Sequence, residues 1–192
     1  MKSWNWGIVG LGSIANDFAK ALCDSGRTLY AAASRTQEKA DAFAARYHAR
    51  KAYGSYEELY RDPDVDIIYV ATPHSCHYEV MMECLEHGKH VLCEKAITVS
   101  DRQLEQVTRL AQQKGLIVME AMTVFHMPLY RRLHEILQAG ELGPVKMVQV
   151  LFGCDKEYDP NNRFFSKDLA GGALLDIGTY ALSFARFFFA QF

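Results

Sequence analysis

The chain has 192 residues, of which 49% are hydrophobic, and carries a formal net charge of −2. This length allows one or two domains, and the hydrophobic fraction is ample for a packed core. The small charge excludes a broad basic surface for nucleic acid or an anionic membrane, and no apolar run approaches the ~20 residues that span a bilayer.

The cysteines and the first residues indicate where the protein is located. Five cysteines are scattered along the chain without a C-x-x-C pair or a metal-ligand spacing. The first residues lead directly into an apolar strand and lack the profile of a signal peptide. We therefore expect reduced thiols in a cytoplasmic protein that has no metal site.

A glycine-rich turn organises the first part of the chain. The apolar stretch that starts at Gly7 predicts a short buried strand, and residues 16–25 predict a helix. Between them, Gly10 permits a tight turn, Gly12 lets the backbone approach a pyrophosphate, and Ala15 allows helix and strand to pack closely. Free N–H groups at the helix start, together with the helix dipole, would hold the phosphates. The alternative is an ordinary strand-to-helix turn with incidental glycines.

Strands and helices alternate over the residues that follow. This alternation predicts a parallel, doubly wound α/β sheet of the Rossmann type. Ser100 is expected to cap the last of these helices at its start, and Gly88 and Gly115 to follow helix ends. The expected strands are residues 28–33, 51–53, 65–71, 90–93 and 116–119. The expected helices are residues 37–47, 56–60, 75–87 and 100–114.

The pattern then changes, and we expect a dinucleotide-binding domain of residues 1–122 and a partial second domain of residues 123–192. A helix over residues 127–139 and a strand over residues 145–152 predict the beginning of an α+β open-sheet domain. A further helix is expected from about Ala173. The strand would lack neighbours, and several phenylalanines of the last helix would have no evident cover. These are Phe184, Phe187, Phe188 and Phe192.

The end of the second strand indicates which dinucleotide is bound. NAD sites usually place Asp or Glu there, against the ribose 2′-hydroxyl. This chain instead has Ser34 and Arg35, with Lys39 one turn further on. A carboxylate would repel a 2′-phosphate, whereas Ser34 and Arg35 would bind one. We therefore expect a preference for NADP, with NAD as the second choice; the alternative is a solvated arginine at a helix start.

Polar residues also follow a central strand, at the edge where open α/β sheets bind ligands. Thr72 and Pro73 end the strand, and His74 and His77 come next. Their place beside the expected nicotinamide site favours a role in cofactor binding. Surface histidines are the alternative.

A charged pair, Glu94 and Lys95, closes the next strand. A lysine near a cofactor loses solvation, which lowers its pKa and suits it to proton transfer. An exposed lysine after a strand is the alternative.

A glycine pair, Gly171-Gly172, precedes the last expected helix. In that helix Asp176 and Tyr180 are four residues apart, so they share one face of an α-helix. An acid and a phenol on one face are able to point into a common cleft. The alternative is an amphipathic helix with a tyrosine at its edge.

In this order and spacing, the motifs resemble the glucose–fructose oxidoreductase and inositol dehydrogenase (Gfo/Idh/MocA) family over essentially the whole chain. Within the family the chain looks most similar to the dihydrodiol dehydrogenase and xylose dehydrogenase-like branch, which has tyrosine where inositol dehydrogenases have histidine. The motifs that carry the resemblance are residues 10–15, 33–35, 71–73, 94–95, 120–121 and 171–178.

The resemblance implies a two-domain NAD(P)-dependent oxidoreductase that transfers a hydride between nicotinamide and a hydroxyl-bearing carbon of a sugar, polyol or diol. Lys95 and Tyr180 would handle the proton. Asp176 would position the substrate hydroxyl, and Arg163 is a weaker candidate for a contact with the cofactor or the substrate. The second domain would cover the nicotinamide and often form an interface, so we expect a homodimer or higher oligomer. The expected cofactor-binding residues are Gly10, Gly12, Ser13, Ile14, Ala15, Ser34, Arg35, Lys39, Thr72, Pro73, His74, His77, Glu94 and Lys95.

Two features depart from the family pattern. Ala96 stands where the family usually has proline after Glu94-Lys95. The chain is also shorter than family members, so we expect a truncated second domain and little or no turnover. Two rival functions stay open: a non-catalytic dinucleotide-binding or sensor protein, and an NAD-dependent, redox-assisted glycoside hydrolase of the same fold.

Overall fold

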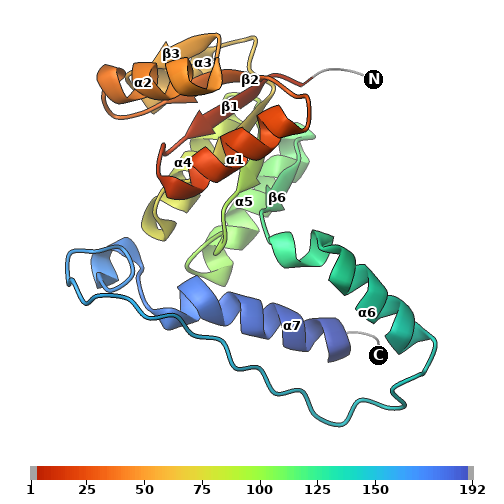
Figure 1. The fold of residues 1–192 in the computed structure, drawn as a ribbon. Helices are drawn as coiled ribbons and strands as arrows, with labels where there is room; N and C mark the ends of the chain where they lie inside the picture. The colour runs from red at the N-terminus through yellow and green to blue at the C-terminus, as the bar shows by residue number, and fades with distance from the viewer. Residues whose placement is uncertain (1–3, 190–192) are drawn as a thin grey trace. The chain divides into compact units, whose positions relative to one another are not determined.

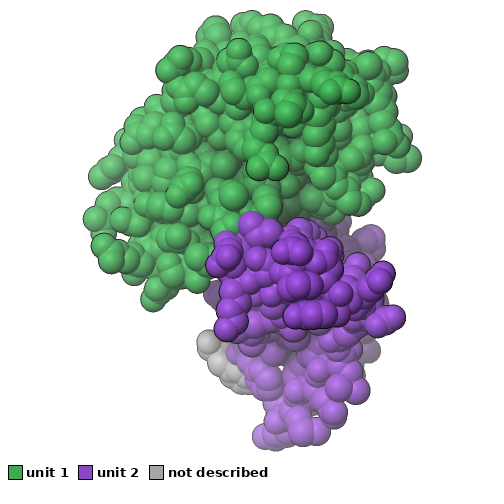
Figure 2. Space-filling view, turned by 90° about the vertical axis from the view of Figure 1, so that its left-hand side faces the viewer, with its two compact units in different colours: residues 1–120 green, residues 121–192 purple. Residues whose placement is uncertain are grey.

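The structure, a computed structural model, describes residues 4–189. The chain divides into two compact units, Met1–Glu120 and Ala121–Phe192, which Figure 2 shows in green and purple. The boundary expected from the sequence lies two residues later.

The first unit contains a six-stranded parallel sheet with the order β3-β2-β1-β4-β5-β6 (Figure 1). This is the strand order of dinucleotide-binding folds, and the direction of winding reverses between β1 and β4. The predicted doubly wound α/β sheet is therefore confirmed. The strands are β1 (Trp6–Val9), β2 (Leu29–Ala33), β3 (Lys51–Tyr53), β4 (Ile67–Val70), β5 (His90–Cys93) and β6 (Val118–Glu120).

Five helices accompany these strands, with α1 packed beside α2 and α4 beside α5. The predicted cap of α5 is confirmed, because the Ser100 Oγ accepts a hydrogen bond from the Gln103 N–H at 3.3 Å. Gly88 and Gly115 follow helix ends with φ of 74° and 65°, a conformation that favours glycine. The helices are α1 (Ser13–Asp24), α2 (Gln37–Tyr47), α3 (Tyr56–Arg61), α4 (His74–Glu86) and α5 (Asp101–Lys114).

The core of the first unit lies on both faces of the sheet. All five residues of β2 are buried, and so are the last three of β1 and of β4. A parallel strand covered on both faces must be apolar throughout, which explains the continuous apolar runs in the sequence. The three alanines of β2 leave room for α1 and α2, both of which contact this strand.

Hydrogen bonds from the loop before β4 stabilise the end of the sheet at which β4 and β5 begin. Lys89 is buried, and its Nζ donates to the carbonyl oxygens of Asp62 and Val65. The Asp62 carboxylate accepts hydrogen bonds from the Tyr53 hydroxyl at 2.8 Å and from Lys51 at 3.0 Å. Lys89 and Asp62 therefore have structural partners at this end of the sheet.

In the second unit, two helices pack through aromatic rings. Tyr130 on α6 is buried, and the rings of Phe184 and Phe187 on α7 meet it edge-on at 5.8 and 5.2 Å. Phe188 contacts both of these phenylalanines, so the expectation that the three rings lack cover was wrong; Phe192 lies outside the described residues. The elements are η1 (Thr123–His126), α6 (Pro128–Gln138), η2 (Lys167–Leu169), η3 (Leu174–Gly178) and α7 (Thr179–Phe189).

The expected strand over residues 145–152 is not formed, so that prediction was wrong. A strand needs a neighbour for its N–H and C=O groups. The described residues of the second unit contain no other strand, which leaves this segment unpaired. As a result, Met147 and Leu151 are 79% and 89% exposed.

None of the helices in the described part of the chain is long and apolar enough to cross a membrane.

Candidate cofactor and catalytic site

The glycine turn lies where β1 and β4 meet. The Ala71 N–H donates to the Val9 carbonyl at 2.9 Å, which holds the two strand ends together. Gly10 has φ of 83°, and a Cβ on it would lie 2.6 Å from the Ala71 carbonyl oxygen. Gly12, by contrast, has no atom within 4 Å of a Cβ position and is exposed. The turn is thus closed on the protein side and open in front of α1.

The open side of the turn fits a pyrophosphate. Gly12 is the N-cap of α1, where no side chain accepts a hydrogen bond and the first turn holds no acidic residue. The first N–H groups of a helix have no intrahelical partner and attract an anion. Ser13 and Ile14 are exposed at this end of α1, whereas Ala15 of the same helix is fully buried. Thr72 follows the last residue of β4 by two positions, and its buried Oγ1 has no hydrogen-bond partner among the described residues.

At the end of β2, Ser34 is buried and its N–H donates to the Tyr53 carbonyl at 3.1 Å. Arg35 and Lys39 are exposed, and Glu38 is the acidic residue in the same turn at the start of α2. Burial raises the pKa of Tyr56, and the positive charge of neighbouring Arg35 opposes that rise. Tyr56 therefore lies within the electrostatic influence of Arg35. Tyr56 is not among the site residues expected from the sequence, because a tyrosine in a short helix carries no signal of its own.

The two histidines of α4 hold the loop that follows β5. His77 is fully buried, with Nδ1 2.9 Å from the Ala96 carbonyl oxygen and Nε2 2.8 Å from the Thr72 carbonyl oxygen. His74, also buried, places Nε2 3.0 Å from the Lys95 carbonyl oxygen. Burial lowers the pKa of His77, although the two carbonyl oxygens favour its protonated form. Both rings thus contact backbone at the expected cofactor edge.

The same loop is fixed from β4 and β6. The buried Tyr69 hydroxyl donates to the Glu94 carboxylate, and its ring stacks on Phe18 at 3.8 Å. Burial is the main reason that the pKa of Tyr69 is raised well above its ordinary value. The Ile97 N–H donates to the Glu120 carboxylate at 2.9 Å. Side chains from three elements therefore fix the loop that carries Lys95.

Lys95 itself is half-buried, and its peptide bond to Ala96 is cis. It lies beyond the carboxyl end of β5 in the first unit, while Tyr180 and Asp176 belong to the second. The chain therefore divides the expected proton-handling pair between its two units.

In the second unit, Arg163 and Asp176 come together, with 4.0 Å between guanidinium nitrogen and carboxylate oxygen. The glycine pair allows this approach of Arg163 to Asp176. A Cβ on Gly171 would lie 2.6 Å from the Arg163 carbonyl oxygen, and the Gly171 N–H donates to the Ser166 carbonyl at 2.8 Å. The preceding loop thus folds tightly over the glycines. The Tyr180 ring meets Phe152 edge-on at 5.7 Å.

Asp176 and Tyr180 do not belong to one regular α-helix. Asp176 lies in the π-helical turn η3, and α7 begins at Thr179. The expected helix from about Ala173 is therefore formed, but its first turns are π-helical, so Asp176 and Tyr180 do not have the regular α-helical spacing. Wider π turns of this kind are frequent at functional sites.

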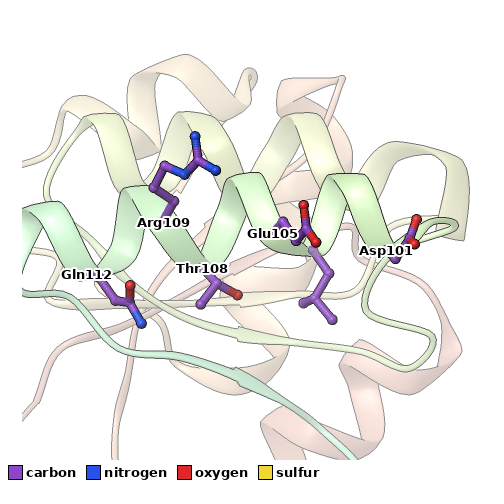
Figure 3. A pocket seen from close by; sticks show the side chains of 6 residues that line it. Asp101, Glu105, Thr108, Arg109 and Gln112 are labelled. Carbon is purple, nitrogen blue, oxygen red and sulfur yellow. The ribbon is translucent and has the colours of Figure 1, made fainter.

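A separate pocket of about 450 Å³ lies along α5 (Figure 3). It contains none of the expected cofactor or catalytic residues. Its lining consists of Asp101, Leu104, Glu105, Thr108, Arg109 and Gln112.

Comparison with protein families decides the assignment. Residues 4–122 match the oxidoreductase family with an NAD-binding Rossmann fold, and residues 130–192 match the Gfo/Idh/MocA C-terminal domain. The chain belongs to the Gfo/Idh/MocA oxidoreductase family. The family resemblance inferred from the sequence is confirmed.

Several Gfo/Idh/MocA relatives are similar over nearly the whole chain. Trans-1,2-dihydrobenzene-1,2-diol dehydrogenase of Xenopus tropicalis is 39% identical over 96% of this chain and 56% of its own length. D-xylose 1-dehydrogenase (NADP(+)) of Hypocrea jecorina is 38% identical over 93% and 51%, respectively. A 3-ketoreductase from Actinomadura kijaniata, solved with NADP and TDP-benzene, is 30% identical, with a TM-score of 0.83 over 97% of this chain and 57% of that one. The chain therefore spans about half the length of these relatives.

Proposed function

We propose that this chain is the NADP-binding part, with the beginning of the substrate domain, of an oxidoreductase that acts on a sugar, polyol or diol. Residues 1–122 form the nucleotide-binding domain and residues 123–192 the partial substrate domain. One observation carries the proposal. The glycine turn is open in front of α1, and Ser34 and Arg35, instead of Asp or Glu, directly follow the neighbouring strand β2.

The nicotinamide ring, when bound, supplies the hydride chemistry. The start of α1 holds the pyrophosphate, and Ser34, Arg35 and Lys39 hold the 2′-phosphate. The Thr72 hydroxyl, Pro73 and Glu94 border the nicotinamide half. His74 and His77 act there by holding the loop in place.

Protein side chains move the proton. Tyr180 exchanges a proton with the substrate oxygen, and the Lys95 ammonium stabilises the tyrosinate form because an adjacent positive charge favours it. Asp176 orients the substrate hydroxyl, and Arg163 restrains Asp176 through its charge. The fixed loop around Lys95 supports this assignment, since a proton-transfer group must be held within hydrogen-bonding reach.

The relatives support the substrate class and the cofactor. Their names record a diol, D-xylose and NADP(+), and the solved ketoreductase was crystallised with NADP. That enzyme was also solved with one tyrosine replaced by phenylalanine and with one lysine replaced by alanine or glutamate. We extend the proposal to a cytoplasmic homodimer or higher oligomer for the full-length protein, with a small molecule as substrate.

Cofactor titration tests the proposal. NADPH should bind roughly ten to a hundred times more tightly than NADH, because charge-assisted hydrogen bonds to the 2′-phosphate contribute ~1.5–3 kcal/mol. Arg35→Asp should reverse the preference. Arg50→Asp, which makes the same charge change at another exposed site, should keep it. Equal affinities, or tighter NADH binding by the unaltered chain, would refute the NADP assignment.

The rival functions make different predictions for the same preparation. A redox-assisted hydrolase would carry cofactor that does not exchange during dialysis. A sensor would bind and release NADP but oxidise no member of a polyol and aldose panel, even when the full-length protein is assayed.

A further inference from the structure

The Asn16 side chain connects the glycine turn to the far end of α2. Its Nδ2 donates to the Gly12 carbonyl oxygen at 2.7 Å. Its Oδ1 accepts hydrogen bonds from the Tyr47 hydroxyl at 2.8 Å and from the Arg46 guanidinium at 3.2 Å. Asn16 and Tyr47 are both partly buried. The amide thus uses its donor and its acceptor ends on two different elements.

The contact with Gly12 controls the direction of one peptide group. The Gly12 carbonyl also accepts the Asn16 backbone N–H, at a longer 3.3 Å, so the side chain makes the shorter of its two bonds. In a planar trans peptide, the C=O and the following N–H point in opposite directions. A carbonyl held toward the helix therefore turns the Ser13 N–H away from it. That N–H faces the open side of the turn.

Tyr47 gives this arrangement its rigidity. Its ring packs against Phe43 at 4.7 Å, and Phe43 is buried in the first unit. An asparagine bonded only to its own helix would be free to change rotamer, because Ser and Asn side chains readily exchange local backbone partners. The Tyr47 hydroxyl restricts the Asn16 amide to the orientation in which Nδ2 faces Gly12. The same helix begins at Gln37, two residues after Arg35.

We propose that Asn16 and Tyr47 are positioning residues that aim the Ser13 N–H at the pyrophosphate of the dinucleotide. The proposal rests on the proposed function, because it requires that NADP binds at the glycine turn. It adds that pyrophosphate affinity depends on a tyrosine 31 residues away from Asn16 in sequence. Sequence reasoning did not find either residue.

The test compares two ligands. NADPH uses the pyrophosphate site, whereas adenosine 2′-monophosphate reaches only the site at Ser34 and Arg35. In the 192-residue chain, Asn16→Ala and Tyr47→Phe should each weaken NADPH binding about threefold to tenfold, as expected for a lost hydrogen bond. Binding of adenosine 2′-monophosphate should change less than twofold. Tyr30→Phe is the matched control, since its hydroxyl bonds Asp64 at the opposite edge of the sheet.

Each outcome is decisive. Unchanged NADPH affinity in both variants, beside tight binding by the unaltered chain, would overturn the positioning role and leave the NADP assignment intact. Equal weakening of both ligands, or weakening by Tyr30→Phe, would show a general structural effect and overturn it as well. Failure of the unaltered chain to bind NADPH would refute the proposed function itself. Tyr47→Phe retains the ring packing, so it is informative even if Asn16→Ala fails to fold.

Discussion

At the scale of single residues, Gly10 and Gly12 occupy neighbouring positions for different physical reasons. Gly10 is required by the protein, because its φ of 83° and its 2.6 Å approach to the Ala71 carbonyl leave no room for a Cβ. Gly12 has an ordinary φ of −88° and open space around it. Its lack of a side chain matters only to something that approaches from outside. Gly10 therefore serves folding, whereas Gly12 serves binding.

Alanine substitution tests this separation. Gly10→Ala should lower the free energy of unfolding by ~1–3 kcal/mol or more, since strain and overlap act together. Gly12→Ala, at the N-cap of α1, should cost less than Gly10→Ala, at most about 1 kcal/mol, yet weaken NADPH binding at least tenfold. Urea unfolding and NADPH titration measure the two effects. Equal loss of stability in both variants would contradict this reading of the turn.

His77 makes stability depend on pH. Burial lowers its pKa in the folded state, against the opposing effect of its carbonyl partners. The unfolded chain, with a histidine pKa of about 6.5, then binds more protons than the folded chain. Stability is therefore fully present above about pH 6.5 and falls as the pH drops through the folded-state pKa. Unfolding curves between pH 7.5 and 5 should be flatter for His77→Gln than for the unaltered chain; parallel curves would exclude His77 as the source.

The sequence predicted which residues gather at the strand ends, but not what they touch. The glycines, Ser34 and Glu94 were found because parallel strands end at one edge. Asn16, Tyr56 and Tyr69 were missed. Their partners are distant in sequence, and a hydrogen bond between separate elements produces no periodic pattern of residues in the sequence.

At the scale of helices, two N-caps in the first unit differ. The Ser100 Oγ accepts the Gln103 N–H, whereas the Thr36 side chain makes no such bond at the start of α2. Ser100→Ala should therefore cost about 1 kcal/mol of stability, within the 0.5–2 kcal/mol range of such caps. Thr36→Ala should cost less than half of that. Denaturant unfolding of both variants checks the order, and a larger loss at Thr36 would disprove it.

Helices and strands could be predicted from the sequence where the local residue pattern alone indicates which residues are buried. Strands β1, β2 and β4 of the first sheet are buried over most or all of their length, so an apolar run of four or five residues identifies each of these three. Residues 145–152 show a comparable pattern but form no strand, because pairing depends on a neighbour that the described residues do not provide. The turn at Leu174–Gly178 is π-helical for reasons that residue type does not signal.

At the scale of the molecule, apolar exposure is concentrated in the second unit. Met147, Leu151, Phe152 and Tyr158 are 79%, 89%, 55% and 73% exposed. Contiguous apolar surface promotes association. We expect the 192-residue chain to associate through residues 145–192, as measured by light scattering. Met147→Lys with Leu151→Lys should reduce the apparent mass, while the same charges at exposed Gln112 and Gln113 should not; a compact monomer before any substitution would contradict the expectation.

The position of β1 in the middle of the sheet has a consequence for biosynthesis. β1 leaves the ribosome first, yet one of its two neighbours is β4. At roughly 5–20 residues per second, that neighbour follows several seconds later. Until then one side of β1 has no strand to pair with, and Gly10 lacks the Ala71 backbone against which it packs. A nascent chain halted before residue 71 would therefore present the glycine motif without a turn able to hold phosphate.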